Sequence, residues 1–177
     1  MRGAGEEPEI RELKLTESIF QELAELSRNI YFFEGIPVEN LNELCQDIGL
    51  FEFPADTSIV RQGSPGDSFF LMYSGRAKVR VKRGFLRGTL EVATLVRGHV
   101  FGEMALVNDD HKRRASIRAK ENTFMMAFER EALEQLAADE PAIGLEVYRA
   151  LAGALAKRLS VASGHAAHFK AMALKHN

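Results

Sequence analysis

The spacing of hydrophobic residues changes twice along the chain. Toward both ends, apolar residues recur every three or four positions, which is the period of an amphipathic helix. Between Phe51 and Phe128 they form short β-branched or aromatic runs separated by single glycines, a pattern typical of short strands and tight turns. The sequence therefore predicts an N-terminal helical extension over residues 1–49, a β domain over 50–128 and C-terminal helices over 129–177.

Two helices are expected in the N-terminal part and two in the C-terminal part. The first covers about Ile19 to Asn29, and the second begins at Pro37 and ends at Gly49. Proline suits the first turn of a helix and glycine suits its end. Near the C-terminus a helix begins at Arg130, and Pro141 marks the break into a longer one.

The longer C-terminal helix carries a regular apolar seam. Its members recur at spacings of three and four, with alanines beside them, and they are Tyr148, Leu151, Leu155 and Leu159. Such a seam allows two helices to approach closely. We expect a homodimer through this helix, and packing of the seam on the protein's own barrel is the alternative.

The middle of the chain contains a clear hairpin. Ala77 to Val81 alternates in polarity and joins Leu90 to Leu95 across a basic loop over residues 82–89. About eight short strands are expected in this part, so the fold class is mainly β with flanking helices.

Composition excludes several classes of function. The net charge is −2, so no global field favours nucleic acid or anionic lipid. The single cysteine, Cys45, cannot supply a disulfide or a thiolate cluster. No apolar stretch is long enough to span a membrane and no secretory signal begins the sequence, so we expect a cytoplasmic protein without membrane contact. The five histidines are scattered, so no metal site is expected.

Positive charge is concentrated in the middle of the chain. Residues 1–56 hold 13 acidic and 4 basic residues, whereas residues 76–118 hold 11 basic and 4 acidic ones. The middle therefore favours an anionic ligand.

One segment combines a glycine, an acid and arginines. Gly102 precedes a short turn, so backbone N–H groups can approach an anion. Arg113 or Arg114 supplies a planar cation that fits a phosphate. Glu103 would repel a phosphate unless it faced a donor such as a ribose hydroxyl. The alternative is that Glu103 pairs with one of these arginines and that Gly102 is an ordinary turn.

The segment resembles the phosphate-binding cassette of the cyclic-nucleotide-binding domain family, which includes bacterial catabolite activator proteins and kinase regulatory subunits. The likeness extends upstream through Ile59 to Leu71 and Gly75, and it covers about residues 32–163 in all. It implies an eight-stranded β-roll, a double-stranded β-helix similar to a jelly roll, with a hinge helix and a dimer helix. It also implies a non-enzymatic regulatory module that needs no cofactor and has cAMP or cGMP as its ligand.

The resemblance gives individual residues a role. Glu103 would hold the ribose 2′-hydroxyl, Arg113 would bind the cyclic phosphate, and the backbone of Gly102, Met104 and Ala105 would complete the cradle. Further positions implied around the phosphate, sugar and base are Arg114, Ala115, Val79, Val92, Ala93, Arg158 and Ser163.

Two positions depart from the family pattern. Ala162 stands where activator proteins have a threonine that approaches the purine, and Arg114 stands where kinase-type domains have a small or hydroxyl residue. We expect cAMP rather than cGMP. A nucleotide-free dimerisation scaffold on the same fold and a metal-dependent β-barrel enzyme are the competing hypotheses.

The expected output lies outside the β domain. Only 14 residues follow Ser163, fewer than a helix-turn-helix requires, so direct DNA binding is not expected. The output is expected to pass through an effector protein that the sequence does not identify, through a change of the dimer, or through sequence outside these 177 residues.

Overall fold

The computed structural model describes residues 9–14, 16, 18–19, 21–22, 40, 48–82 and 88–174. Most of the two predicted N-terminal helices, including Cys45, lies outside the described residues, although residues 18–19, 21–22 and 40 are helical. Ahead of them, β1 (Arg11–Leu13) pairs antiparallel with β2 (Gly49–Phe53). Strand β1 was not expected, because residues 1–49 were predicted to be a helical extension. An ion pair of 2.9 Å between Arg11 and Glu52 accompanies this pairing. Three residues are too few for a polarity pattern to indicate a strand.

Two antiparallel sheets form the β domain. One has the strand order β1-β2-β9-β4-β7 and the other has the order β3-β8-β5-β6. The bounds of the strands are β2 (Gly49–Phe53), β3 (Ser58–Val60), β4 (Ser68–Ser74), β5 (Ala77–Lys82), β6 (Thr89–Leu95), β7 (Val100–Phe101), β8 (Ser116–Ala119) and β9 (Thr123–Glu129). The predicted fold class, mainly β with flanking helices, is confirmed. The division of the chain into three parts stays a prediction.

Strand β4 has two buried faces, which explains its unbroken apolar sequence. Phe69 and Leu71 belong to a core layer that also holds residues of the C-terminal helices. Phe70 and Met72 alternate with them and face the interior of the roll between the two sheets. Successive strand residues point to opposite sides, so one strand contributes to both cores.

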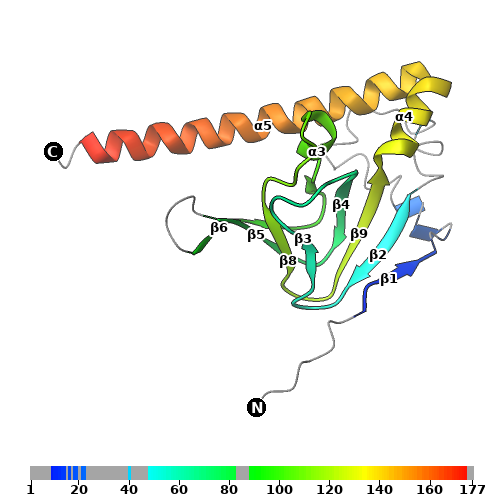
Figure 1. Ribbon diagram of the computed structural model, residues 1–177, viewed down its shortest axis with the longest axis horizontal. Helices are drawn as coiled ribbons and strands as arrows, with labels where there is room; N and C mark the ends of the chain where they lie inside the picture. Colours follow the sequence, from blue (N-terminus) through cyan, green and yellow to red (C-terminus); the bar gives the residue numbers. More distant parts are fainter. Residues whose placement is uncertain are drawn as a thin grey trace, which may run out of the picture.

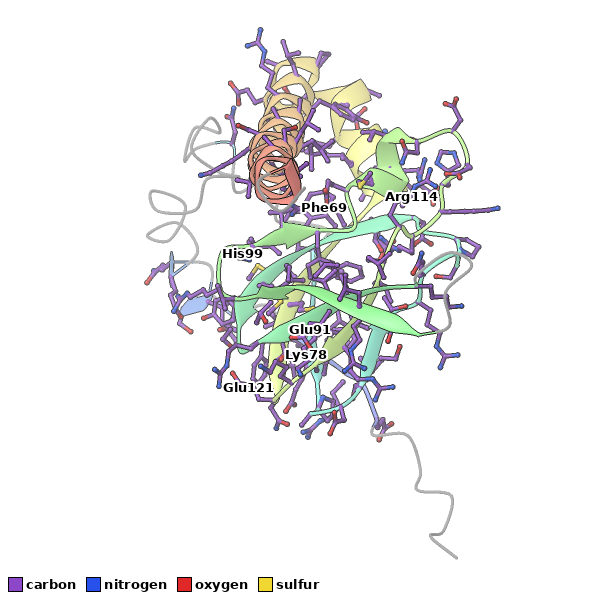
Figure 2. All side chains as sticks on the ribbon, turned by 90° about the vertical axis from the view of Figure 1, so that its left-hand side faces the viewer. Phe69, Lys78, Glu91, His99, Arg114 and Glu121 are labelled. Carbon is purple, nitrogen blue, oxygen red and sulfur yellow. The ribbon has the colours of Figure 1, made fainter. Side chains whose placement is uncertain are left out.

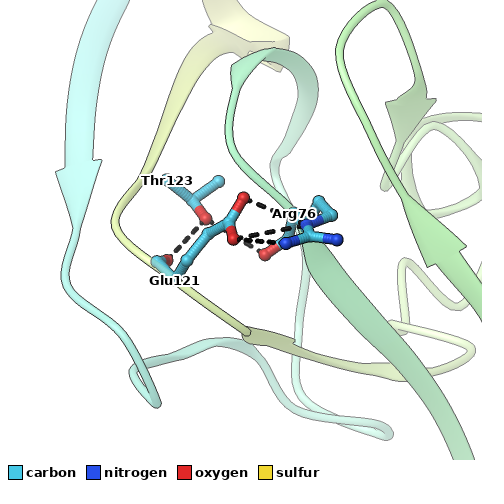
Figure 3. A network of polar contacts seen from close by, with 3 residues as sticks. All are labelled: Arg76, Glu121 and Thr123. Carbon is cyan, nitrogen blue, oxygen red and sulfur yellow. Dashed lines mark hydrogen bonds and ion pairs between the residues drawn. The ribbon is translucent and has the colours of Figure 1, made fainter.

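The predicted hairpin is confirmed as the antiparallel pair β5 and β6, which runs from Ala77 opposite Leu95 to Lys82 opposite Thr89 with a shift of register between Val79 and Arg80. A polar network fixes the turn beside it (Figure 3). The guanidinium of Arg76 donates to both oxygens of Glu121, and the hydroxyl of Thr123 donates to the carbonyl of Arg76 at 3.1 Å. This network ties the start of β5 to the turn between β8 and β9.

The helices lie across one end of the roll (Figure 1). α3 (Met104–Val107) lies beneath α5 (Pro141–Leu174), and α4 (Arg130–Asp139) connects β9 to α5. The predicted helix start at Arg130 and the break at Pro141 are both confirmed. The C-terminal end of α5 extends past the roll.

α5 presents two apolar faces. Ile143, Val147 and Leu151 are buried, and the latter two pack with Phe69 and Leu71 in the outer core layer. The proposed seam is therefore divided: Leu151 packs on the protein's own roll, whereas Tyr148 and Leu159 are 40% and 69% exposed. A pattern with spacings of three and four does not reveal which of two neighbouring stripes faces the core.

Candidate functional site

The glycine-led turn has the local structure that the sequence indicated. We call residues Phe101–Leu106 and Lys112–Ser116 the cassette. Gly102 follows β7 with a φ of 86°, a conformation that glycine adopts readily and other residues do not. A Cβ atom at Gly102 would lie 2.6 Å from Nη1 of Arg113. The glycine therefore permits both the turn and the close approach of the guanidinium.

Arg113 lies in the interior, with a relative exposure of 6%. Its Nη1 donates to the carbonyl of Ser68 at 2.5 Å and to that of Gly102 at 3.2 Å, and its Nη2 donates to the Ser68 hydroxyl at 3.0 Å. The guanidinium carbon lies 5.5 Å from the centre of the Phe70 ring. Desolvation lowers the pKa of Arg113, and the charges of Asp67, Glu129 and Glu103 oppose this shift.

Glu103 is completely buried beside it. Its Oε1 accepts from Nη1 of Arg158 at 2.5 Å, and its Oε2 is buried without a hydrogen-bond partner among the described residues. Desolvation raises the pKa of Glu103, while the positive charges of Arg158 and Arg113 act to lower it. The alternative in which Glu103 pairs with Arg113 or Arg114 is wrong, because the ion-pair partner comes from α5.

Arg130, the first residue of α4, also forms hydrogen bonds with the cassette. Its Nη2 donates to the carbonyl of Ala105 at 2.6 Å and to that of Gly66 at 3.1 Å. Its own backbone N–H donates to the carbonyl of Asp67 at 2.6 Å. The helix that leaves the roll is thus bonded directly to the cassette.

A cavity of about 680 Å³ opens next to the cassette, between the roll and α5. We call it the α5 cavity. Its walls are mostly apolar, and Arg158 both lines it and pairs with Glu103. The lining residues are Val92, Ala93, Thr94, Leu95, Gly98, His99, Val100, Ala154, Lys157, Arg158, Val161 and Ala162.

The structure brings together only part of the predicted site. Glu103 and Arg113 are buried in the cassette, and Val92, Ala93 and Arg158 line the α5 cavity. Arg158 connects the two groups, because it lines the cavity and pairs with Glu103.

The other predicted residues of the turn are placed less favourably. Met104 is 41% exposed, and the N–H of Ala105 donates to the carbonyl of Gly102 at 3.1 Å, so it is already engaged within the cassette. Arg114 is exposed and pairs with Asp110 at 2.9 Å, on the outer side of the roll (Figure 2). Ala115 is half-buried. Ligand contacts by these residues stay predictions.

Two predicted residues of the sugar and base pocket lie outside the α5 cavity. Val79 packs against the inner core of the roll, because its side of β5 faces the opposite sheet. Ser163 is exposed on α5, whereas its neighbours Val161 and Ala162 line the cavity.

Several residues of the site were missed from the sequence. Ser68 and Arg130 hold the cassette, and His99 and Lys157 line the α5 cavity. At Gly66 a Cβ atom would lie 2.5 Å from Nε of Arg113, so this glycine is also part of the cassette's packing. Gly66 and Ser68 stand in the upstream segment that resembles the family, which is the signal that could have identified them. For Lys157 the signal was its place next to Arg158.

The sequence was compared with models of known protein families. Residues 50–140 match the model described as the cyclic nucleotide-binding domain. The chain belongs to this family. Its resemblance to catabolite activator proteins and kinase regulatory subunits is thereby confirmed.

Curated members of the family match parts of the chain. The cAMP-dependent protein kinase regulatory subunit of Emericella nidulans is 36% identical over 95 residues, which are 53% of this chain and 22% of that protein. The cGMP-dependent protein kinase, isozyme 1, of Drosophila melanogaster is 31% identical over 127 residues, which are 66% of this chain and 16% of that protein. The chain thus spans about a fifth of the length of these relatives.

Solved structures of the family share the fold. A cyclic nucleotide-binding domain from Methylobacillus flagellatus has a TM-score of 0.78 and 27% identity, over 88% of this chain and 86% of that one. The Thermus thermophilus catabolite activator protein has a TM-score of 0.68 and 28% identity, over 79% of this chain and 63% of that one. The implied β-roll architecture is therefore confirmed.

Within the described part of the chain, no group of three or more His, Cys, Asp or Glu residues is arranged to hold a metal ion. None of the helices described is long and apolar enough to cross a membrane.

Proposed function

We propose that this domain is a non-catalytic sensor that binds a cyclic purine nucleotide in the cassette and reports binding through α4 and α5. Arg113 would bind the cyclic phosphate and Glu103 would hold a ribose hydroxyl. The base would enter the α5 cavity. Residues of the roll and of α5 would then contact one ligand together.

The observation that supports this proposal most directly is that Arg113 is buried and has no ion-pair partner among the described residues. Its hydrogen bonds go to the neutral oxygens of Ser68 and Gly102, and no carboxylate of a described residue forms an ion pair with it. A buried charge is costly unless it is paired. A phosphodiester anion would pair this guanidinium in two-point geometry.

Glu103 supports a sugar beside the phosphate. Its Oε1 is bonded to Arg158, and its buried Oε2 has no partner among the described residues. A carboxylate oxygen only accepts hydrogen bonds, so it requires a donor such as a hydroxyl. A nucleotide could therefore satisfy Oε2 without removing Arg158 from Oε1.

Replacement of Arg113 tests the proposal. Each charged hydrogen bond contributes about 1.5–3 kcal/mol. Arg113→Ala is therefore expected to weaken cAMP and cGMP binding at least about tenfold in titration calorimetry. The matched control is Arg118→Ala on β8, because the side chain of Arg118 is exposed and donates to the backbone carbonyl of Asp56. The control should keep the affinity of the unmodified domain.

Equal affinities for Arg113→Ala and the unmodified domain would refute the phosphate role of Arg113. If neither nucleotide at millimolar concentration raised the melting temperature, the domain would instead be a nucleotide-free scaffold. Ligand at about a hundred times its Kd stabilises a protein by about 2.7 kcal/mol, so binding would be visible.

Transmission would begin at Arg130. This residue bonds the carbonyl oxygens of Ala105 and Gly66 and starts α4. α4 in turn packs tightly on α5, since a Cβ at Gly144 would lie 2.5 Å from that of Ala137. A shift of the cassette on phosphate binding would therefore move α4 and α5 together, as in other two-state switches.

We also propose that the domain dimerises through the exposed face of α5. The apolar residues of that face recur at spacings of three and four, and they are Leu145, Tyr148, Ala152, Leu155 and Leu159. This is the spacing of a two-helix seam. Leu159→Glu should convert a dimer to a monomer in sedimentation velocity, and the off-seam control Ser160→Glu should not. A monomeric unmodified domain at micromolar concentration would contradict this proposal.

A further inference from the structure

The loop between α3 and β8 carries a histidine, His111, that contacts both the cassette and α4. Its Nδ1 lies 3.1 Å from the carbonyl oxygen of Ala105, and its Nε2 lies 3.4 Å from Nη1 of Arg130. Its own carbonyl accepts from the backbone N–H of Gly66 at 2.8 Å. The φ of His111 is 47°, in the left-handed region that few residues other than glycine adopt. The histidine is therefore held by its backbone and by its ring between the cassette and the first residue of α4.

The two ring contacts fix the protonation state that suits this position. A carbonyl oxygen only accepts hydrogen bonds, and a guanidinium only donates them. Nδ1 must therefore carry the hydrogen that Ala105 accepts, and Nε2 must be the unprotonated nitrogen that accepts from Arg130. Only a neutral ring satisfies both partners. A protonated ring would present an N–H group and a positive charge to the guanidinium.

Arg130 depends on this histidine for one side of its guanidinium. Its Nη2 donates to the carbonyls of Gly66 and Ala105, whereas Nη1 has no hydrogen-bond partner other than His111 among the described residues. His111 is also exposed, so a proton can reach its ring. Histidine is the side chain whose charge ordinarily changes between about pH 5 and pH 8. The contact between the cassette and α4 thus contains a group that can respond to pH in this range.

We infer that His111 is a positioning residue that couples the cassette to α4 while its ring is neutral, and that protonation of the ring weakens this coupling. Acid would then separate nucleotide binding in the cassette from the movement of the helices. This second consequence rests on the proposed function. The coupling itself can be measured without a ligand.

Other charged groups surround His111 and could also respond to pH. They are Asp67 before β4, Glu129 at the end of β9, Arg113 and Arg114 of the cassette, and Asp109, Asp110 and Lys112 in the loop of His111 itself, whereas α3 contributes none. Desolvation raises the pKa of Glu129, and the charge of Asp67 raises it further. The effect of the histidine ring must therefore be separated from that of Glu129.

Hydrogen exchange of the full chain without nucleotide measures the coupling. The quantity compared is the protection factor of amides in the first turns of α4, corrected for intrinsic exchange rates, at about pH 5 and about pH 8. A hydrogen bond to a charged group changes an equilibrium constant by about tenfold or more. We therefore expect protection in the unmodified chain to be about tenfold lower at the acidic pH.

His111→Asn isolates the ring. Asparagine tolerates the left-handed backbone, and its amide nitrogen can still donate to Ala105, but the acceptor that faces Arg130 is lost. Protection of α4 should then be low and equal at both pH values. Arg130→Met removes the partner instead and should abolish the pH dependence as well. The matched control is Asp109→Asn, because Asp109 is exposed in the same loop, and this variant should keep the pH dependence.

Two results without nucleotide would overturn the inference. They are equal protection of α4 at both pH values in the unmodified chain, and a pH dependence that survives His111→Asn or Arg130→Met, which would assign the response to another group such as Glu129.

The same measurement with saturating cAMP or cGMP tests the consequence for signalling. Nucleotide should raise the protection of α4 at about pH 8 and leave it unchanged at about pH 5. An equal rise at both pH values would contradict the role of His111 in transmission. If calorimetry detected no binding of either nucleotide, the proposed function would fail, whereas the comparison without ligand would still decide whether His111 couples the cassette to α4.

Discussion

The cassette and the α5 cavity are adjacent but built differently. In the cassette, Glu103 and Arg113 are 0% and 6% exposed, and the bonds of Arg113 run to oxygens of the roll itself. The cavity is mostly apolar and lies between two separate elements, β6 with β7 on one side and α5 on the other. The phosphate end of a ligand would thus meet a preformed polar site. The base end would meet the α5 cavity, whose width depends on the position of α5.

The packing of α5 on the roll explains how the cassette and the α5 cavity can respond separately. Its first turns are fixed on the roll by Val147 and Leu151, which are completely or almost completely buried. From Ala154 onward the residues facing the roll line the cavity instead. Segments with fewer buried apolar contacts open at lower free energy. The cavity can therefore change shape while the cassette stays intact.

The largest expected effect comes from breaking the cassette at Gly102. Gly102→Ala places a Cβ 2.6 Å from Nη1 of Arg113 in a backbone with φ 86°. Displacement of Arg113 from its carbonyl partners would cost about 1.5–3 kcal/mol in addition to the backbone strain. Nucleotide affinity should fall by about tenfold to a hundredfold. Urea denaturation and calorimetry measure the two effects.

Gly63→Ala is the matched control for this substitution. Gly63 has the same φ of 86°, but a Cβ there would have no atom within 4 Å. It should show only the cost of the left-handed backbone, about 1–2 kcal/mol, and unchanged affinity. If both variants behaved alike, the packing of Gly102 against Arg113 would not matter for binding.

Most of the architecture follows from local patterns. Alternating polarity predicted the hairpin of β5 and β6. Pro141 predicted the boundary between α4 and α5, because a proline inside a helix removes a backbone hydrogen bond. The continuous apolar run of β4 does not by itself reveal that the strand contributes to two separate cores. Assigning those cores requires knowing that helices cover one face of the sheet, which is tertiary information.

Only part of the candidate site could be predicted from the sequence. Gly102, Glu103 and Arg113 lie within one short segment, so their chemistry could be inferred together. The pairing of Glu103 with Arg158 joins residues 55 positions apart, and no periodicity reports such a contact. Ser68 was missed for the same reason, because its carbonyl and hydroxyl acquire a role only when β4 lies beside Arg113.

A smaller effect is expected at Arg158, the residue that links the two regions. Its positive charge lowers the pKa of Glu103, whereas desolvation raises that pKa by more. Arg158→Ala should therefore raise the pKa of Glu103 further above its ordinary value. Because the side chain of Arg158 is 45% exposed, we expect a loss of about 1–2 kcal/mol in the free energy of unfolding at about pH 7, less than for a fully buried pair.

The pH dependence separates this electrostatic effect from lost packing. An acid whose pKa is higher in the folded than in the unfolded state binds more protons when folded, so stability falls as pH rises from its ordinary pKa to its raised pKa. The destabilisation by Arg158→Ala should thus be large at about pH 7 and small at about pH 4, where Glu103 is protonated in both proteins. In a Glu103→Gln background the same substitution should show no such pH dependence. A loss that is equal at both pH values would mean that Arg158 holds α5 by packing alone, and that the cassette and the cavity are not coupled through this charge.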